Sequence, residues 1–169
     1  MDAMDCLFTR RSIRSFKPEP LSPDAVREPI RAAMYAPSAG NQRPWHFLVV
    51  SRREDLAFIA RIHPYAGMCL QASGAVLVCG EPGLAKHPDM WVQDCAAATQ
   101  NLLLALHAEG LGGVYVGVHP REERMKPLAA HFGLPASIVP FSLVPYGRPA
   151  TVPEQPDRFM AERIRTDRW

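Results

Sequence analysis

A short arginine-rich segment near the start of the chain has the residue types of an anion site. It reads Arg10-Arg11-Ser12-Ile13-Arg14. If the segment is extended, Arg10, Ser12 and Arg14 point to one side, because side chains alternate along a strand. Two guanidinium groups and a hydroxyl on one side suit a phosphate or another polyanion. A solvated basic patch and a nucleic-acid contact are the alternatives. A nucleic acid is disfavoured because the chain has no basic recognition helix and no aromatic stacking run.

A second candidate is the polar segment 36–45, which is rich in proline, serine, glycine and side-chain amides. These residue types form a defined loop between a helix and a strand. Asn41 and Gln42 each carry donors and an acceptor, so they can match the mixed edge of a heterocycle. An ordinary turn is the alternative, and we expect Trp45 in the core rather than on a ligand.

The segment 110–117 is rich in glycine and could be mistaken for a dinucleotide-binding fingerprint. That fingerprint requires a strand followed by a helix, whereas this segment follows a predicted helix and enters a predicted strand. We therefore expect these glycines to permit close packing and close backbone approach to a flat group.

Side chains for covalent or metal chemistry are missing from the sequence pattern. There is no serine or cysteine nucleophile with its base at a recognisable spacing. The four scattered cysteines are expected to be buried, reduced thiols of a cytoplasmic protein. The six histidines form no pair at metal-ligand spacing, so no zinc site is expected. Difficult chemistry would therefore need a bound cofactor, and no catalytic side-chain acid or base is predicted.

Hydrophobic patterns predict the elements that must position these segments. Helices are predicted over residues 2–9, 22–34, 53–62, 90–109 and 121–132, and strands over 45–51, 75–79, 113–118 and 139–144. Ser22 and Pro23 are typical of a helix start, whereas Pro29 is expected to kink that helix. Together these elements predict one α+β domain over residues 1–169, with a small sheet and a central helix.

The predicted helix 90–109 is apolar around most of its circumference. A helix of this kind belongs in a core or in a subunit interface, and Gly110 is placed to end it. The arm 149–169 is polar and rich in arginine but ends in Ile164 and Trp169. A free tail needs no such apolar side chains, so we expect this arm to be docked, with a neighbouring subunit as one surface for it.

Composition limits the function classes. The 169 residues are 47% hydrophobic with a net charge of +2, which excludes whole-chain disorder and a bulk electrostatic partner. No apolar run is long enough to span a bilayer, and the acidic start lacks the features of a signal peptide. Nine arginines stand in residues 1–61, none in 62–120 and seven in 121–169. Arginine suits bidentate contacts with phosphate, although a composition bias explains many of them equally well.

Taken in chain order, these segments resemble the nitroreductase family of FMN-dependent oxidoreductases. Residues 10–14 resemble its Arg-Arg-Ser-x-Arg element, and residues 37–45 resemble its Pro-Ser-x-x-Asn-x-x-Pro-Trp loop. Residues 91–112 resemble its long dimer helix and the following strand. The resemblance implies a nitroreductase-like fold, in which helices flank a small, mostly antiparallel sheet and a long central helix lies at the dimer interface.

Three features depart from the family pattern. Gly147-Arg148-Pro149 stands where Gly-Tyr-Pro is usual, and Pro29 and Pro127 fall inside predicted helices. The segment 81–90 is short where larger relatives insert helices that roof the substrate pocket, which predicts an open pocket.

The resemblance also implies which residues would hold FMN in a homodimer whose two sites lie at the interface. The phosphate, ribityl chain and pyrimidine edge would be held by Arg10, Arg11, Ser12 and Arg14, with the phosphate also reached by Arg158. From the partner chain, the ring would be approached by Pro37, Ser38, Ala39, Gly40 and Asn41. Along the flavin would lie Tyr115, Val116 and Gly117, with the Gly117 N–H donating to N5.

The activity that the resemblance implies is hydride transfer from NADH or NADPH through the flavin to a small electrophilic acceptor. Nitroaromatics and quinones are the generic acceptors. Two alternatives remain at this stage: a flavin-binding carrier or sensor without turnover, and an anion- or nucleic-acid-binding module that uses the arginine-rich ends. We expect no nucleic-acid partner and no membrane partner.

Overall fold

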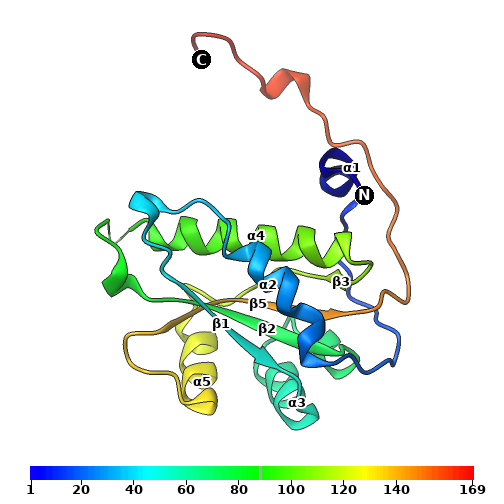
Figure 1. Cartoon of the computed structure of the whole chain (residues 1–169), viewed down its shortest axis with the longest axis vertical. Coiled ribbons are helices and arrows are strands. Elements are labelled where there is room, and N and C mark those ends of the chain that lie inside the picture. Colours follow the sequence, from blue (N-terminus) through cyan, green and yellow to red (C-terminus); the bar gives the residue numbers. More distant parts are fainter. Residues whose placement is uncertain (88) are drawn as a thin grey trace.

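The computed structural model describes residues 1–87 and 89–169, in which helices cover both faces of a five-stranded sheet (Figure 1). The strands are β1 (Trp45–Val50), β2 (Gly74–Gly80), β3 (Gly112–Gly113), β4 (Val116–Gly117) and β5 (Val139–Gly147). Their order is β1-β2-β5-β3, with β4 also paired to β5, and every strand pair is antiparallel. The predicted small antiparallel sheet is confirmed.

The centre of the sheet is β2, whose residues are all buried. Its side chains alternate between two cores, as a strand requires. Val76 and Val78 pack with α2 (Arg27–Ala33) and α4 (Trp91–Ala108), while Leu77 packs with α3 (Arg53–Ile62) and α5 (Glu122–Phe132). An apolar run therefore becomes a strand covered on both faces.

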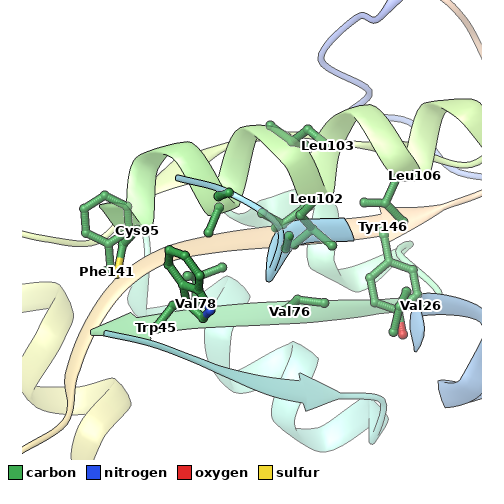
Figure 2. Packing of buried hydrophobic residues seen from close by; sticks show 14 of the residues in the cluster. Val26, Trp45, Val76, Val78, Cys95, Leu102, Leu103, Leu106, Phe141 and Tyr146 are labelled. Carbon is green, nitrogen blue, oxygen red and sulfur yellow. The ribbon is translucent and has the colours of Figure 1, made fainter. Parts of the chain in front are cut away.

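The long helix α4 lies across one face of the sheet. Figure 2 shows Leu102 and Leu106 pointing from α4 toward Val76 and Tyr146 of the sheet. Gly110, with φ of 72°, follows the end of α4 as predicted. The remaining short helices are α1 (Ala3–Thr9), η1 (Pro23–Val26), η2 (Ala39–Asn41), η3 (Gly67–Leu70), η4 (Pro82–Leu84) and η5 (Ala161–Arg163).

Charged and aromatic side chains join α3 to α5 on the opposite face. The buried Asp55 carboxylate accepts hydrogen bonds from Arg52 Nε at 2.7 Å and from His131 Nε2 at 2.7 Å. The His131 ring stacks on Phe58, with ring centroids 3.7 Å apart. This cluster fixes the C-terminal end of α5 against α3.

The predicted helix 22–34 is two helices rather than one kinked helix. It begins as the 3-10 helix η1 and continues as α2, with the change between Val26 and Arg27. Pro29 has no N–H and its ring would clash with the carbonyl four residues earlier, at Ala25, in a continuous α-helix. The break therefore precedes Pro29, which lies in the first turn of α2. The other internal proline, Pro127, lies within an unbroken α5.

The predicted strand 113–118 is likewise two short strands, β3 and β4. Both keep one register with β5, which places Val114 opposite Pro145 in the gap between them. A proline cannot donate a ladder hydrogen bond, so the pairing is interrupted there. The last strand, β5, runs to Gly147, three residues beyond its predicted end.

The C-terminal arm extends away from the body past α1 (Figure 1). Residues 151–169 are exposed throughout, including the apolar Phe159, Ile164 and Trp169. The apolar residues of the arm are therefore not docked on this chain, and their docking on a neighbouring subunit stays a prediction. The open pocket predicted from residues 81–90 also stays a prediction, because residue 88 lies outside the described residues. The described helices include none with the length and apolar character needed to cross a membrane.

Candidate functional site

The arginine-rich segment is extended and joined to the sheet. Ile13 N–H donates to Gly113 O at 3.0 Å, and Ser12 forms a parallel bridge with Gly113. Arg11 and Ile13 are buried, whereas Arg14 on the other side is exposed. The predicted alternation is confirmed. A Cβ added to Gly112 would lie 2.6 Å from Ile13 Cγ1, so the predicted close packing at these glycines is confirmed there.

Arg11 makes its hydrogen bonds within the chain. Its Nε donates to Glu154 O at 3.1 Å, and its Nη1 donates to Phe8 O at 2.8 Å and to Arg10 O at 2.7 Å. Only 8% of the residue is exposed. Arg11 therefore links α1 to the C-terminal arm. Its buried side chain lies on the opposite side of residues 10–14 from the exposed Arg14.

Arg10 and Arg158 lie together in a pocket of about 690 Å³ between α1 and arm residues 155–159. Burial, followed by the positive charges of Arg158 and Arg11, lowers the pKa of the Arg10 guanidinium. Neither Arg10 nor Arg158 forms an ion pair among residues 1–87 and 89–169. Asp157 also lines the pocket, and its Oδ1 accepts a hydrogen bond from Phe159 N–H at 2.9 Å. Because the lining has more arginines than carboxylates, the pocket is attractive to an anion. Sequence reasoning predicted Arg10 and Arg158 for one phosphate site.

The loop before β1 has a defined and unusual backbone. Gly40, Asn41 and Arg43 have positive φ values of 58°, 55° and 51°. The loop is held by Ala39 N–H, which donates to Asp94 Oδ1 at 3.0 Å. Asp94 is buried, and its Oδ2 has no hydrogen-bond partner among the described residues. The sequence signal for Asp94 is an acid in the first turn of a helix, which sequence reasoning did not use.

Within one chain, this loop and the arginine-rich segment lie at opposite ends of α4 (Figure 1). The loop contacts Asp94, whereas Thr9 Oγ1, just before the segment, is 2.8 Å from His107 Nε2. His107 lies thirteen positions after Asp94 on the helix, a distance of about 20 Å along the axis. The structure therefore does not bring residues 37–41 to the arginine-rich segment of the same chain.

The third predicted set, Tyr115 to Gly117, does lie near the arginine-rich segment. Gly117 follows the bridged residue Gly113 by four residues, at most about 14 Å of extended chain. Tyr115 is 40% exposed, whereas the side chain of Val116 is buried in the core. A Cβ added to Gly117 would meet no atom within 4 Å, so open space lies beside this backbone.

The Gly117 peptide faces away from the sheet. Val118 N–H donates to Phe141 O at 3.1 Å, and successive N–H groups of an extended chain point to opposite edges. The N–H and carbonyl of Gly117 therefore point away from β5. Its carbonyl accepts hydrogen bonds from His63 Nε2 and from Arg124 Nη1, each at 2.9 Å. Sequence reasoning missed both donors, because they come from distant parts of the chain.

Comparison with known proteins decides the family. The model of the nitroreductase family matches residues 7–80 and 82–148. The chain belongs to the nitroreductase family. This nitroreductase-family chain is 45% identical to a provisionally named NADH dehydrogenase/NAD(P)H nitroreductase of Archaeoglobus fulgidus, with 99% of each chain covered. The family assignment makes the protein an oxidoreductase and confirms the resemblance drawn from the motifs.

Solved structures agree with the fold of this nitroreductase-family member. A provisionally named NADH dehydrogenase/NAD(P)H nitroreductase from Bacteroides thetaiotaomicron matches with a TM-score of 0.93 and 36% identity, covering 99% of this chain and 98% of that one. A provisionally named nitroreductase from Desulfovibrio desulfuricans, solved with FMN, matches with a TM-score of 0.84 and 29% identity, covering 100% of this chain and 99% of that one. The nitroreductase-like α+β fold is thereby confirmed.

Arg148 stands where the nitroreductase family usually has tyrosine, and in this chain it forms an ion pair. Its Nε donates to Glu19 Oε1 at 2.8 Å, and both side chains are about half exposed. The side chain is thus paired on the surface beside the end of β5.

Proposed function

We propose that the protein is an FMN-dependent oxidoreductase that transfers hydride from NADH or NADPH to a small electrophilic acceptor, such as a nitroaromatic or a quinone. The observation that carries this proposal is the pair Arg10 and Arg158 in a chain of the nitroreductase family. They share a pocket and form no ion pair among the described residues. The FMN complex of the relative from Desulfovibrio desulfuricans supports the choice of cofactor.

The residues present fit the two ends of FMN. A phosphate carries a charge of about −1.5 to −2 near neutral pH, which suits the two guanidinium groups. The open space beside Gly117 suits a flat ring, because no side chain fills it. The segment from Ser12 through Gly113 to Gly117 would connect these two ends along one edge of the sheet.

FMN, when bound, would supply a ring that accepts and donates hydride. The chain's own residues would bind and orient it. Arg10 and Arg158 would hold the phosphate, and the Gly117 N–H would hydrogen bond the ring at N5. Burial raises the pKa of the Cys69, Cys79 and Cys95 thiols to about 12, so these thiols are poor nucleophiles.

We also propose that two copies complete the site. The loop 37–41 lies about 20 Å from the arginine-rich segment along α4, so it would serve the site of the other copy. The outward side of α4 carries no charge and exposes Gln93 and Gln100 among alanines, as suits contact with a second helix. The exposed apolar residues of the arm would be covered in the same dimer.

The test is made on purified protein. A flavin absorbance band that bleaches when NADH or NADPH is added without oxygen, and returns when a nitroaromatic or quinone is added, is the expected result. Protein that binds no FMN overturns the proposal. Bound FMN that neither nicotinamide bleaches favours a carrier or sensor.

Shared sites are tested by mixing two defective copies. Arg10→Ala damages the arginine-rich segment and Asn41→Ala damages the loop. If each site joins the segment of one copy to the loop of the other, a mixed dimer contains one intact site. Titration of the isolated mixed dimer should then show half of its sites with wild-type FMN affinity. If every site in the mixed dimer remains defective, the sites lie within single chains.

A further inference from the structure

Gly117 is held by two donors that come from different helices. His63 directly follows α3, and Arg124 lies in the first turn of α5. Both side chains donate to the Gly117 carbonyl at 2.9 Å. The two helices that cover one face of the sheet therefore meet at a single backbone carbonyl beside the open edge of β4.

The donor atom of His63 is fixed by its second hydrogen bond. Tyr65 N–H donates to His63 Nδ1 at 3.2 Å, so Nδ1 accepts and the proton is assigned to Nε2. Burial, with only 1% of the residue exposed, is the main cause that lowers the pKa of His63. The neutral ring with its proton on Nε2 is the form that donates to Gly117.

Arg124 is also restrained in place. Its guanidinium lies over the ring of Tyr65, 5.5 Å from the ring centroid, a distance within the range of cation–π attraction. Tyr65 thus contributes its backbone to His63 and its ring to Arg124. The three side chains form one network around the Gly117 carbonyl.

Apart from His63 and Arg124, Gly117 is held by the short pairing of β4 with β5 and by the Val118 N–H, which donates to Phe141 O. Gly117 has no side chain, and glycine has the widest range of backbone angles. The strand β4 has two residues and is separated from β3 by the interruption opposite Pro145. The Gly117 carbonyl belongs to the peptide shared with Val118, whereas the N–H belongs to the peptide shared with Val116. The two hydrogen bonds to the carbonyl therefore hold the Cα atom between these peptides, from which the N–H projects.

We propose that His63 and Arg124 are positioning residues that aim the Gly117 N–H at the flavin and thereby set the reduction potential of bound FMN. This inference rests on the proposed function. An N–H donor at N5 favours the oxidised ring, because N5 carries its own hydrogen after reduction. Loss of the positioning network should therefore weaken the binding of oxidised FMN more than that of reduced FMN.

The test compares His63→Phe, which removes the donor, with His63→Gln, which retains a side-chain N–H. One hydrogen bond contributes about 1 kcal/mol, so His63→Phe should raise the Kd of oxidised FMN about fivefold and that of reduced FMN less than twofold. For a two-electron couple this difference raises the midpoint potential by about 12–20 mV. His63→Gln should restore most of the shift, and Arg124→Met should shift the potential in the same direction as His63→Phe.

The matched control is His131→Phe at the other end of α5. It removes the hydrogen bond to Asp55 and should lower thermal stability without changing the ratio of the two FMN affinities. If His63→Phe does not fold, Arg124→Met decides the question. Wild-type protein that binds FMN, together with an unchanged affinity ratio in the variants that fold, overturns the positioning proposal alone. Wild-type protein that binds no FMN overturns the proposed function as well.

Discussion

The charges that join α3 to α5 are paired within the chain, whereas Arg10 and Arg158, between α1 and the C-terminal arm, form no ion pair among the described residues. Asp55 accepts hydrogen bonds from Arg52 and His131. Arg10 and Arg158 share a pocket with no ion pair to an acidic residue of the described chain. The first cluster is complete in the folded chain and stabilises it. Under the proposed function the second is completed by the phosphate of FMN, so binding rather than folding should depend on it.

The largest expected effect is on binding at the unpaired cluster. The double variant Arg10→Ala with Arg158→Ala removes two charged donors, each worth about 1.5–3 kcal/mol. The Kd for FMN should rise by at least about 100-fold in a fluorescence titration. Thermal stability should stay unchanged or increase slightly, because the repulsion between the two guanidinium groups is removed. A double variant that loses thermal stability but binds FMN with wild-type affinity would reverse the comparison.

The paired cluster should show the opposite response. Asp55→Asn keeps the shape of the side chain but removes the charge that both donors require. Because the carboxylate is buried, the free energy of unfolding should fall by about 2 kcal/mol, as measured by urea denaturation. The Kd for FMN should change less than twofold. A large loss of FMN affinity without loss of stability would show that the α3–α5 cluster is part of the binding site.

The pH dependence of stability separates the clusters further. Burial alone would raise the pKa of Asp55, but the hydrogen bonds and charges of Arg52 and His131 outweigh it, and the pKa lies below its ordinary value of 3.8. The stabilisation from this carboxylate is therefore fully present above the unfolded-state pKa and is lost as the pH falls through the folded-state pKa. The stability difference between wild type and Asp55→Asn should shrink between about pH 5 and pH 3. A constant difference over that range would contradict the assignment.

The sequence predicts the body of the molecule better than the site. The apolar period of residues 53–62 predicts α3 with its observed bounds, because one continuous local pattern decides that helix. The predicted strand 113–118 fails because its interruption depends on Pro145, which is opposite only after the sheet has formed. Similarly, the break before Pro29 depends on a clash between its ring and the Ala25 carbonyl. The sequence shows the proline but not the residue at which the helix breaks.

The site shows the same limit. That Arg10 and Arg158 lie together could be predicted, because arginine suits a phosphate and the family resemblance assigns both residues to one phosphate site. His63 and Arg124 could not, because each is a single residue without a motif and they meet Gly117 only in the folded chain. Every residue has a backbone carbonyl, so a side chain can donate to one whatever the type of the accepting residue. No sequence pattern therefore marks such a network.

The smallest expected effect on stability is that of the ion pair between Arg148 and Glu19. Like the α3–α5 cluster it joins opposite charges, but it is exposed rather than buried. Arg148 pairs with Glu19, but both side chains are about half exposed, so water competes for their charges. Exposed pairs of this kind contribute about 0–1 kcal/mol. Arg148→Ala should therefore change the free energy of unfolding by less than about 0.5 kcal/mol in urea, and high salt should remove most of that change. A larger, salt-independent loss would mean that Arg148 supports the end of β5 by packing of its aliphatic stem rather than by charge.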